Sequence, residues 1–341
     1  MSKVKAKNQN LIKNTDSVFR YNLDLIIMMT PLFILGSYFN GFHAFRLAFS
    51  AILSGVITEF IACKIMKTDN TVKDLSAVSA ALAISLMLPA SCPAYIAASG
   101  AVFSVLVAKI PFGGAKNAPF VPAAAGFAFL CVCFPTEVFT YPSLATATNT
   151  PIVGSEGFVK GIPFSEMLSY GKSIDINYFE MISVLSGKIV GPIGTTSLLA
   201  FVGIGIYLLI RRSNRFVISI SFILTCVIMA MLFPRVNSGI LASIIMELSS
   251  GTLLFVGLIL LHDPATAPSK LPYSVLYGVG AGVICMLLRY FAKYPEAACF
   301  SVLIMNAISP VIEDYIKIFK NRENKKKKSA LNKAKGGNEN G

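Results

Sequence analysis

Ionisable side chains within long apolar runs are the residues of this sequence most able to do chemistry. Glu59 and Glu247 lie inside such runs, and Asp263 ends one directly after His262. A charged group is costly in a bilayer, so it needs a partner, a protonated state or a water-filled path, and a carboxylate there can hold a proton or a cation. Glu247 is the deepest. Three more ionisable residues lie near the predicted ends of such runs: Arg289, Glu296 and Asp314.

Two apolar runs are interrupted by prolines. One contains Pro89 and Pro93, and the other continues from Leu261 through Asp263 to Pro268. Proline breaks a helix because it lacks a backbone donor and clashes with the preceding turn. The carbonyls and helix ends freed in this way can line an ion or ligand site, and matching interruptions in two halves indicate an internal repeat.

Two glycine-rich segments, Phe112 to Asn117 and Gly187 to Ser197, would allow the backbone to approach a flat or phosphorylated ligand. Neither matches a nucleotide-binding fingerprint. The second segment ends in Thr195-Thr196-Ser197, and these hydroxyls precede a predicted helix, where anions bind readily. Capping of that helix by Thr195 or Thr196 is at least as good an explanation.

Three alternating threonines, Thr146, Thr148 and Thr150, lie in the one long segment of low charge, residues 137–193. A loop of this length is usually functional or disordered. From the residue types alone, a turn-rich surface loop is the simpler interpretation. The 7 cysteines show neither the spacing of a zinc site nor a disulfide framework, so no metal site is predicted.

The composition predicts a polytopic helical membrane protein. The chain is 55% hydrophobic and 14% charged, whereas soluble domains carry about 25% charged residues. Apolar runs near the length of about 20 residues that crosses a bilayer recur along the chain. Ten spans are predicted, at about 22–40, 43–65, 75–90, 93–110, 118–136, 194–211, 215–234, 238–261, 272–291 and 295–316.

The basic residues predict the orientation of these spans. The net charge of +13 gathers at both chain ends and in the alternate loops predicted to be cytoplasmic, which hold Lys109 and Lys116 among others, whereas the other loops hold few basic residues, among them Arg235. Both termini are therefore expected on the cytoplasmic side of the membrane. Beside membrane spans, such charge favours contact with anionic lipid over nucleic acid.

The expected fold is therefore all-α, with two inverted five-helix halves and Pro-broken helices. An odd number of spans in each half makes the halves inverted. The predicted parts are a basic N-terminus, a first half, an extracytoplasmic segment (hereafter the outer segment), a second half and a basic disordered tail, at 1–20, 21–136, 137–193, 194–317 and 318–341.

The motifs, taken in order, resemble those of one known family. They are the Pro-broken span, the run from Lys109 to Asn117, the Thr-rich loop that ends in Thr-Pro-Ile, Gly-Pro-Ile-Gly-Thr-Thr-Ser, and His-Asp-Pro-Ala-Thr-Ala-Pro. This set is similar to the RnfD/NqrB family, the flavin-carrying membrane subunits of the Rnf and sodium-pumping NADH:quinone oxidoreductase complexes. The length of the chain resembles RnfD more.

The resemblance implies FMN joined through its phosphate to a threonine of the outer segment by a flavin transferase. Thr150 is the first candidate, followed by Thr146 and Thr148. Further cofactor-binding candidates are Thr195, Thr196 and Asp263, and a second, non-covalent flavin is compatible with the family.

The resemblance also implies a subunit of a redox-driven translocase of the ferredoxin:NAD+ oxidoreductase type, without a catalytic cycle of its own. It would lie in the bacterial cytoplasmic membrane beside other membrane and redox subunits. Electrons would pass through its FMN while Na+ or H+ moves through the bundle.

Two alternatives remain open. The family's attachment motif has an Asp before the threonine, and its Gly-Glu-Thr-Ser has an acidic residue where this chain has Thr195; both acidic residues are missing here. The absence of the Asp favours a flavin-free secondary transporter or channel of the same inverted-repeat layout. A scaffold that only seats partner subunits is the other alternative.

Overall fold

The computed structural model describes residues 15–67, 71–143, 160–169, 184, 187–211, 216–236, 239–268, 270–292 and 296–312. Within these ranges the chain is mainly helical, with one two-stranded antiparallel sheet in which β1 (Tyr141–Pro142) pairs with β2 (Lys160–Gly161). Four candidate site residues lie outside the described residues: Thr146, Thr148, Thr150 and Asp314.

Four helical stretches are long and apolar enough to cross a bilayer. They are Val18–Asn40 within α2 (Thr15–Asn40), α3 (Phe42–Met66), Ala94–Phe112, which contains α5 (Ala94–Leu106) and η3 (Ile110–Phe112), and α15 (Leu271–Phe291). Shorter apolar helices of 10–17 residues are α4 (Ser76–Met87), α6 (Pro122–Cys133), α11 (Leu198–Ile210), α12 (Phe216–Leu232) and Ala297–Ile312.

The helical membrane protein expected from the composition is confirmed by these helices. Each predicted span contains one of them or the bent pair described next. The number of ten crossings and the inversion of the halves stay predictions, because the shorter helices fall below the length of about 20 residues that spans a bilayer.

The eighth predicted span is bent. α13 (Ile240–Ser249) meets Leu253–Leu260 at an angle of 70°, and the latter consists of α14 (Leu253–Phe255) and the π-helix η5 (Val256–Leu260). The structure thus differs from the uninterrupted run expected over 238–261. The break lies at Gly251, whose φ of 61° is in the left-handed region that favours glycine.

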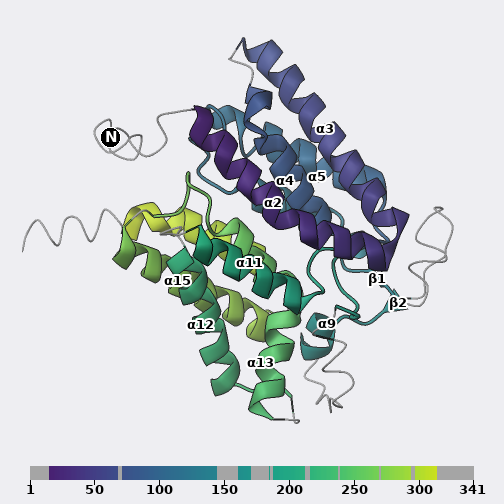
Figure 1. The fold of residues 1–341 in the computed structure, drawn as a ribbon, viewed down its shortest axis with the longest axis vertical. Coiled ribbons are helices and arrows are strands. Elements are labelled where there is room, and N and C mark those ends of the chain that lie inside the picture. The colour runs from purple at the N-terminus through teal and green to yellow at the C-terminus, as the bar shows by residue number, and fades with distance from the viewer. Residues whose placement is uncertain are drawn as a thin grey trace, which may run out of the picture.

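The helices form two neighbouring groups (Figure 1). α2, α3, α4 and α5 lie together in one, and α11, α12, α13 and α15 lie together in the other. α3 packs most extensively on α5, and α12 packs most extensively on α15. A continuous apolar core joins the groups, since it contains Met29 and Leu86 of the first and Phe222 and Phe255 of the second.

The described parts of the outer segment lie at one end of the two helix groups. β1, β2 and the short helix α9 (Phe164–Ser169) are found there, on the right of Figure 1, and α9 lies next to α13. The short helix α7 (Pro135–Val138) leads from α6 into β1. Among the described parts of the outer segment, α9 is therefore packed against the bent span.

Candidate functional site

A cleft between the two helix groups brings together two of the motifs found in the sequence. It is lined by α2 and α4, by Lys116 of the first glycine-rich segment, by Pro122 at the start of α6, and by Asp263. Its empty volume, open solvent included, is about 590 Å³. We refer to this space as the interhelical cleft.

Hydrogen bonds fix the polar wall of the interhelical cleft. The Asn22 side-chain amide donates to the carbonyl oxygen of Asp74 at 2.8 Å, and the Ser79 hydroxyl donates to Asn22 Oδ1 at 2.9 Å. These bonds join α2 to the start of α4, and all three residues are buried. The rest of this wall is mainly apolar, so the cleft offers flat apolar surfaces with few polar groups.

A buried ion pair lies close to this wall. Lys109 and Glu59 are each 1% exposed and form a salt bridge, and Lys109 Nζ also donates to the Ser76 hydroxyl. The sequence indicates Glu59 as a candidate but places Lys109 among the cytoplasmic loop charges. The signal that was missed is the apolar run that extends to Ala108, directly before the lysine.

Asp74 is buried beside this pair, in the 3-10 helix η2 (Thr71–Asp74) that precedes α4. Burial raises the pKa of the Asp74 carboxyl above its usual value, Lys109 opposes the rise, and Glu59 adds to it. A raised folded-state pKa means that the contribution of Asp74 to stability is present below the unfolded-state pKa. That contribution is lost as the pH rises through the folded-state pKa.

We therefore expect Asp74→Asn to raise the unfolding temperature by a few degrees at pH 7 to 8, and to leave it nearly unchanged near pH 4. Thermal unfolding followed by far-ultraviolet circular dichroism at several pH values would check this. If the difference in unfolding temperature between variant and wild type did not change with pH, burial of the charged Asp74 carboxylate would not be its cause.

Asp263 lies at the rim of the interhelical cleft, in the turn that follows η5. Its carboxylate accepts a hydrogen bond from the backbone N–H of Ala265 at 2.9 Å. The neighbouring His262 is buried, with its Nε2 2.9 Å from the hydroxyl of Ser219 on α12. The turn is thus fixed at both residues, and Asp263 is held where it can meet a ligand in the cleft.

Thr195 and Thr196 do not line the interhelical cleft. Both are buried, in a segment whose Ile193 and Gly194 N–H groups donate to the carbonyls of Leu88 and Leu86 at 3.0 and 2.8 Å. The glycine-rich segment therefore docks on the Pro-broken end of α4. The cap of α11 is the hydroxyl of Ser197, which accepts from Ala200 N at 3.4 Å, rather than Thr195 or Thr196.

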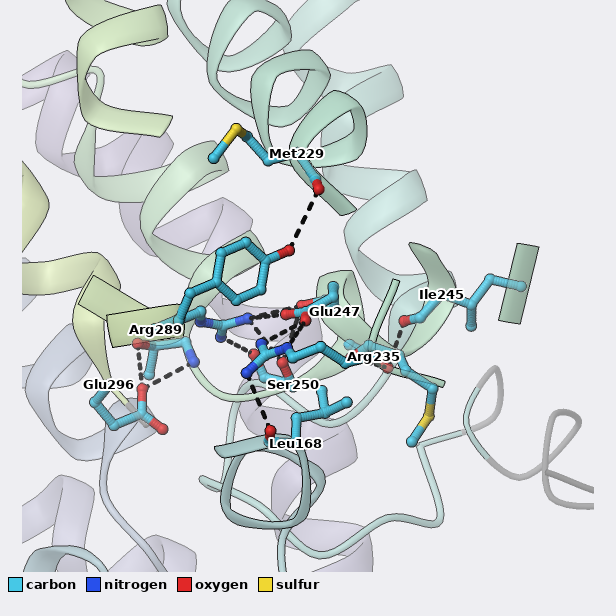
Figure 2. A network of polar contacts seen from close by, with 12 residues as sticks. Leu168, Met229, Arg235, Ile245, Glu247, Ser250, Arg289 and Glu296 are labelled. Atoms are coloured by element: carbon cyan, nitrogen blue, oxygen red, sulfur yellow. Dashed lines mark hydrogen bonds and ion pairs between the residues drawn. The ribbon is translucent and has the colours of Figure 1, made fainter. Parts of the chain in front are cut away.

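Glu247 forms the ion pairs that a buried carboxylate requires. Its side chain is 1% exposed and lies between two arginines, with Arg235 Nε 2.7 Å from Oε1 and Arg289 Nη1 3.2 Å from Oε2. Figure 2 shows both guanidinium groups directed at this carboxylate. The sequence indicates Glu247 and Arg289 only as separate candidates, and it places Arg235 among the loop charges.

Arg289 also binds the backbone at the bend. It donates to the carbonyl of Glu247 at 2.9 Å, to the Ser250 hydroxyl at 2.8 Å and to the Ser250 carbonyl. Glu296 accepts from the N–H of Thr252 at 2.9 Å on the other side of Gly251. A Cβ added at Gly251 would lie 2.9 Å from Glu296 Oε1, so the charged side chains pack closely against the bend.

We refer to Arg235, Glu247, Arg289 and Glu296 as the bend cluster. Two arginines and two glutamates give it no net formal charge, and its carboxylates accept hydrogen bonds from within it or from the bend. Within the residues that the structure describes, no group of three or more His, Cys, Asp or Glu side chains could hold a metal ion. The bend cluster is therefore built to hold backbone in place.

Comparison with known proteins gives a consistent relationship over almost the whole chain. The sequence model of the NQR2, RnfD, RnfE family matches residues 5–320. A subunit of the proton-translocating ferredoxin:NAD+ oxidoreductase complex of Clostridium ljungdahlii is 27% identical over 310 residues, which cover 89% of this chain and 92% of the relative.

Two further relatives carry similar names. A subunit of the Na+-translocating ferredoxin:NAD+ oxidoreductase complex of Acetobacterium woodii is 28% identical over 299 residues, with 86% and 87% of the two chains covered. A subunit of the ion-translocating oxidoreductase complex of Salmonella paratyphi A is 26% identical over 331 residues, with 89% and 94% covered. Together with the family match and the apolar helices, these relatives make the chain a multi-pass membrane protein of the NQR2, RnfD, RnfE family.

Proposed function

We propose that this chain is the RnfD-type subunit of an ion-translocating Rnf-type electron transport complex. In this role it carries FMN and couples electron transfer to the movement of Na+ or H+. The observation that carries the proposal is the family match over residues 5–320, supported by relatives named as subunits of such complexes. The partners would be other membrane and redox subunits in the bacterial cytoplasmic membrane, and a flavin transferase would act during maturation.

We further propose ten crossings in two inverted halves, with both termini cytoplasmic. The packing supports this repeat, because α3 with α5 and α12 with α15 are the second and fourth spans of each half. A buried basic side chain also lies near the end of the fourth span of each half. Lys109 pairs with Glu59 in the first half, and Arg289 pairs with Glu247 in the second. In inverted halves these two ion pairs would lie near opposite faces of the membrane.

The covalent flavin is proposed on Thr150, with Thr146 and Thr148 as the next candidates. β1 and β2 support this placement, since Tyr141 opposite Gly161 and Pro142 opposite Lys160 close the loop that carries these threonines. When bound, FMN would supply the one-electron chemistry. The chain would supply the threonine hydroxyl and the paired strands at the base of the loop.

We propose the interhelical cleft as the place for a second, non-covalent flavin. Its mainly apolar walls on α2 and α4 suit a flat ring system, and Lys116 and Asp263 are polar groups at its lining. Asp263 would also be a carboxylate in the lining that could exchange a proton or a cation. Thr195 and Thr196 are not part of this proposed site, because they pack against the end of α4 instead.

The test is in-gel flavin fluorescence of the denatured protein after co-expression with a flavin transferase, followed by peptide mass spectrometry. We expect an FMN-sized adduct in the wild type and in Thr146→Val and Thr148→Val, and its loss in Thr150→Val. An unmodified wild type, with a known family member modified in parallel, would instead support the flavin-free transporter. That alternative is favoured by the absence of an Asp before the threonines.

A further inference from the structure

The loop that carries Thr146 to Thr150 has two stems, and the bend cluster contacts both. The first stem is β1, where the hydroxyl of the buried Tyr141 lies 3.3 Å from Glu296 Oε1. The second stem is β2 with α9, where the carbonyl of Leu168 accepts from Arg235 Nη1 at 3.1 Å. Both stems are therefore in contact with the bend cluster of the eighth span.

Apolar packing brings α9 to the same place. Leu168 is buried in a small core that is separate from the main one and includes Val236, Ala242 and Met246. The last two belong to α13, which ends at the bend. α9 thus rests on α13 by side-chain packing, and Arg235 fixes its register through the Leu168 carbonyl (Figure 2).

The guanidinium of Arg235 is shaped for this double contact. Its Nε and Nη2 donate to one oxygen of Glu247, while Nη1 donates to Leu168. The group also stacks over the Tyr290 ring, with its carbon 4.5 Å from the ring centroid. A lysine could keep the charge opposite Glu247, but its single nitrogen lacks the planar fork needed for both acceptors in this geometry.

We infer that Arg235 and Glu296 are positioning residues that fix both stems of the flavin-bearing loop on the bent eighth span. The two stems and the bend then move as one body. The inference rests on the proposed function only for what the loop carries; the anchoring itself is a property of the described residues. A change in the bend is transmitted to the loop, and a displacement of the loop is transmitted to the bend.

Hydrogen–deuterium exchange of the full-length protein in nanodiscs tests the anchoring. The reporters are the Glu166 and Met167 amides of α9, which both donate to the carbonyl of Pro163, directly before this helix. We expect Arg235→Gln to speed their exchange by about tenfold or more, since a charge-assisted hydrogen bond is lost. The matched control is Arg211→Gln, which breaks the Arg211–Asp24 ion pair between α11 and α2 and should leave α9 unchanged.

Arg235→Lys separates positioning from simple stability. It should restore the unfolding temperature lost in Arg235→Gln, because the charge opposite Glu247 remains, but it should not restore slow exchange in α9. Tyr141→Phe should give a smaller increase in exchange, confined to peptides around β1. If the amides of α9 exchanged no faster in Arg235→Gln than in the Arg211→Gln control, the inference would be wrong. It would also be wrong if Arg235→Lys fully restored the slow exchange of α9.

The same variants distinguish a failure of the inference from a failure of the proposed function. The exchange measurement does not need flavin, so it stands if the wild type carries no adduct. If the wild type is flavinylated, Arg235→Lys should retain the same amount of adduct and slow reduction of that flavin in the assembled complex. An unchanged reduction rate together with faster exchange in α9 would show that the anchor does not position the flavin.

Discussion

Arg289→Gln is expected to destabilise the folded protein by about 3–5 kcal/mol, the range found when one partner of a buried ion pair is removed. Arg289 is 4% exposed and pairs with Glu247, which is 1% exposed. The substitution also takes donors away from the Ser250 carbonyl and the Ser250 hydroxyl. Both the bend and the carboxylate beside it would lose a partner that water cannot replace.

A thiol-reactive maleimide dye would measure this loss during heating. The chain has no tryptophan, but the described cysteines are buried except Cys133, so unfolding exposes new thiols. Arg211→Gln is again the control, because it breaks an exposed ion pair and should give a small shift. The double variant Glu247→Gln, Arg289→Gln should lose less than the sum of the two single changes. A shift for Arg289→Gln no larger than the control's would show that water reaches Glu247.

Gly278→Ala is the second large effect expected, since α12 and α15 meet at this glycine. A Cβ there would lie 2.0 Å from the Ser221 hydroxyl and 2.5 Å from the Ile218 carbonyl oxygen. The hydroxyl can rotate away, but the carbonyl belongs to the helix backbone, so the helices must separate. Overpacking of this kind costs about 1–3 kcal/mol, occasionally more, and should lower the unfolding temperature clearly.

Gly203→Ala on α11 is the matched control for this change. It adds the same methyl group to an apolar helix, but nothing lies within 4 Å of the new Cβ. Alanine favours helix over glycine, so the control should be neutral or slightly stabilising. Equal effects of the two substitutions, measured with the same dye, would mean that α12 and α15 are not held together at Gly278.

The positions of the helices could be predicted because long apolar runs mark them directly. The bend at Gly251 could not, because Ser250-Gly251-Thr252 contains no proline and the apolar runs on either side add up to one ordinary span. The sequence shows a possible glycine hinge there. Only the packing of Arg289 and Glu296 around it decides that the chain turns.

The candidate site was predictable in its parts but not in its grouping. Asp263 and the glycine-rich segment with Lys116 stand out in the sequence as separate motifs, and the interhelical cleft brings them together across a large distance in sequence. The family resemblance groups Thr195 and Thr196 with Asp263 as cofactor-binding candidates, yet they lie elsewhere in the structure. The sequence assigns Lys109 to a loop, because hydropathy along the chain cannot reveal that a buried carboxylate such as Glu59 is its partner.

The π-helix η5 has a consequence for how relatives should align with this chain. A π-turn accommodates one residue more than the α-helical path around it. Here the carbonyl oxygen of Gly257, within η5, accepts a hydrogen bond from the Ser219 hydroxyl. A relative that lacks one residue between Val256 and Leu260 would pass through this stretch as a regular α-helix, and its later side chains would keep the orientation that they have here. Its counterpart of Asp263 would still line the cleft, so such a relative should be aligned with a one-residue gap at η5, whereas an alignment without the gap would place the wrong residue opposite Asp263.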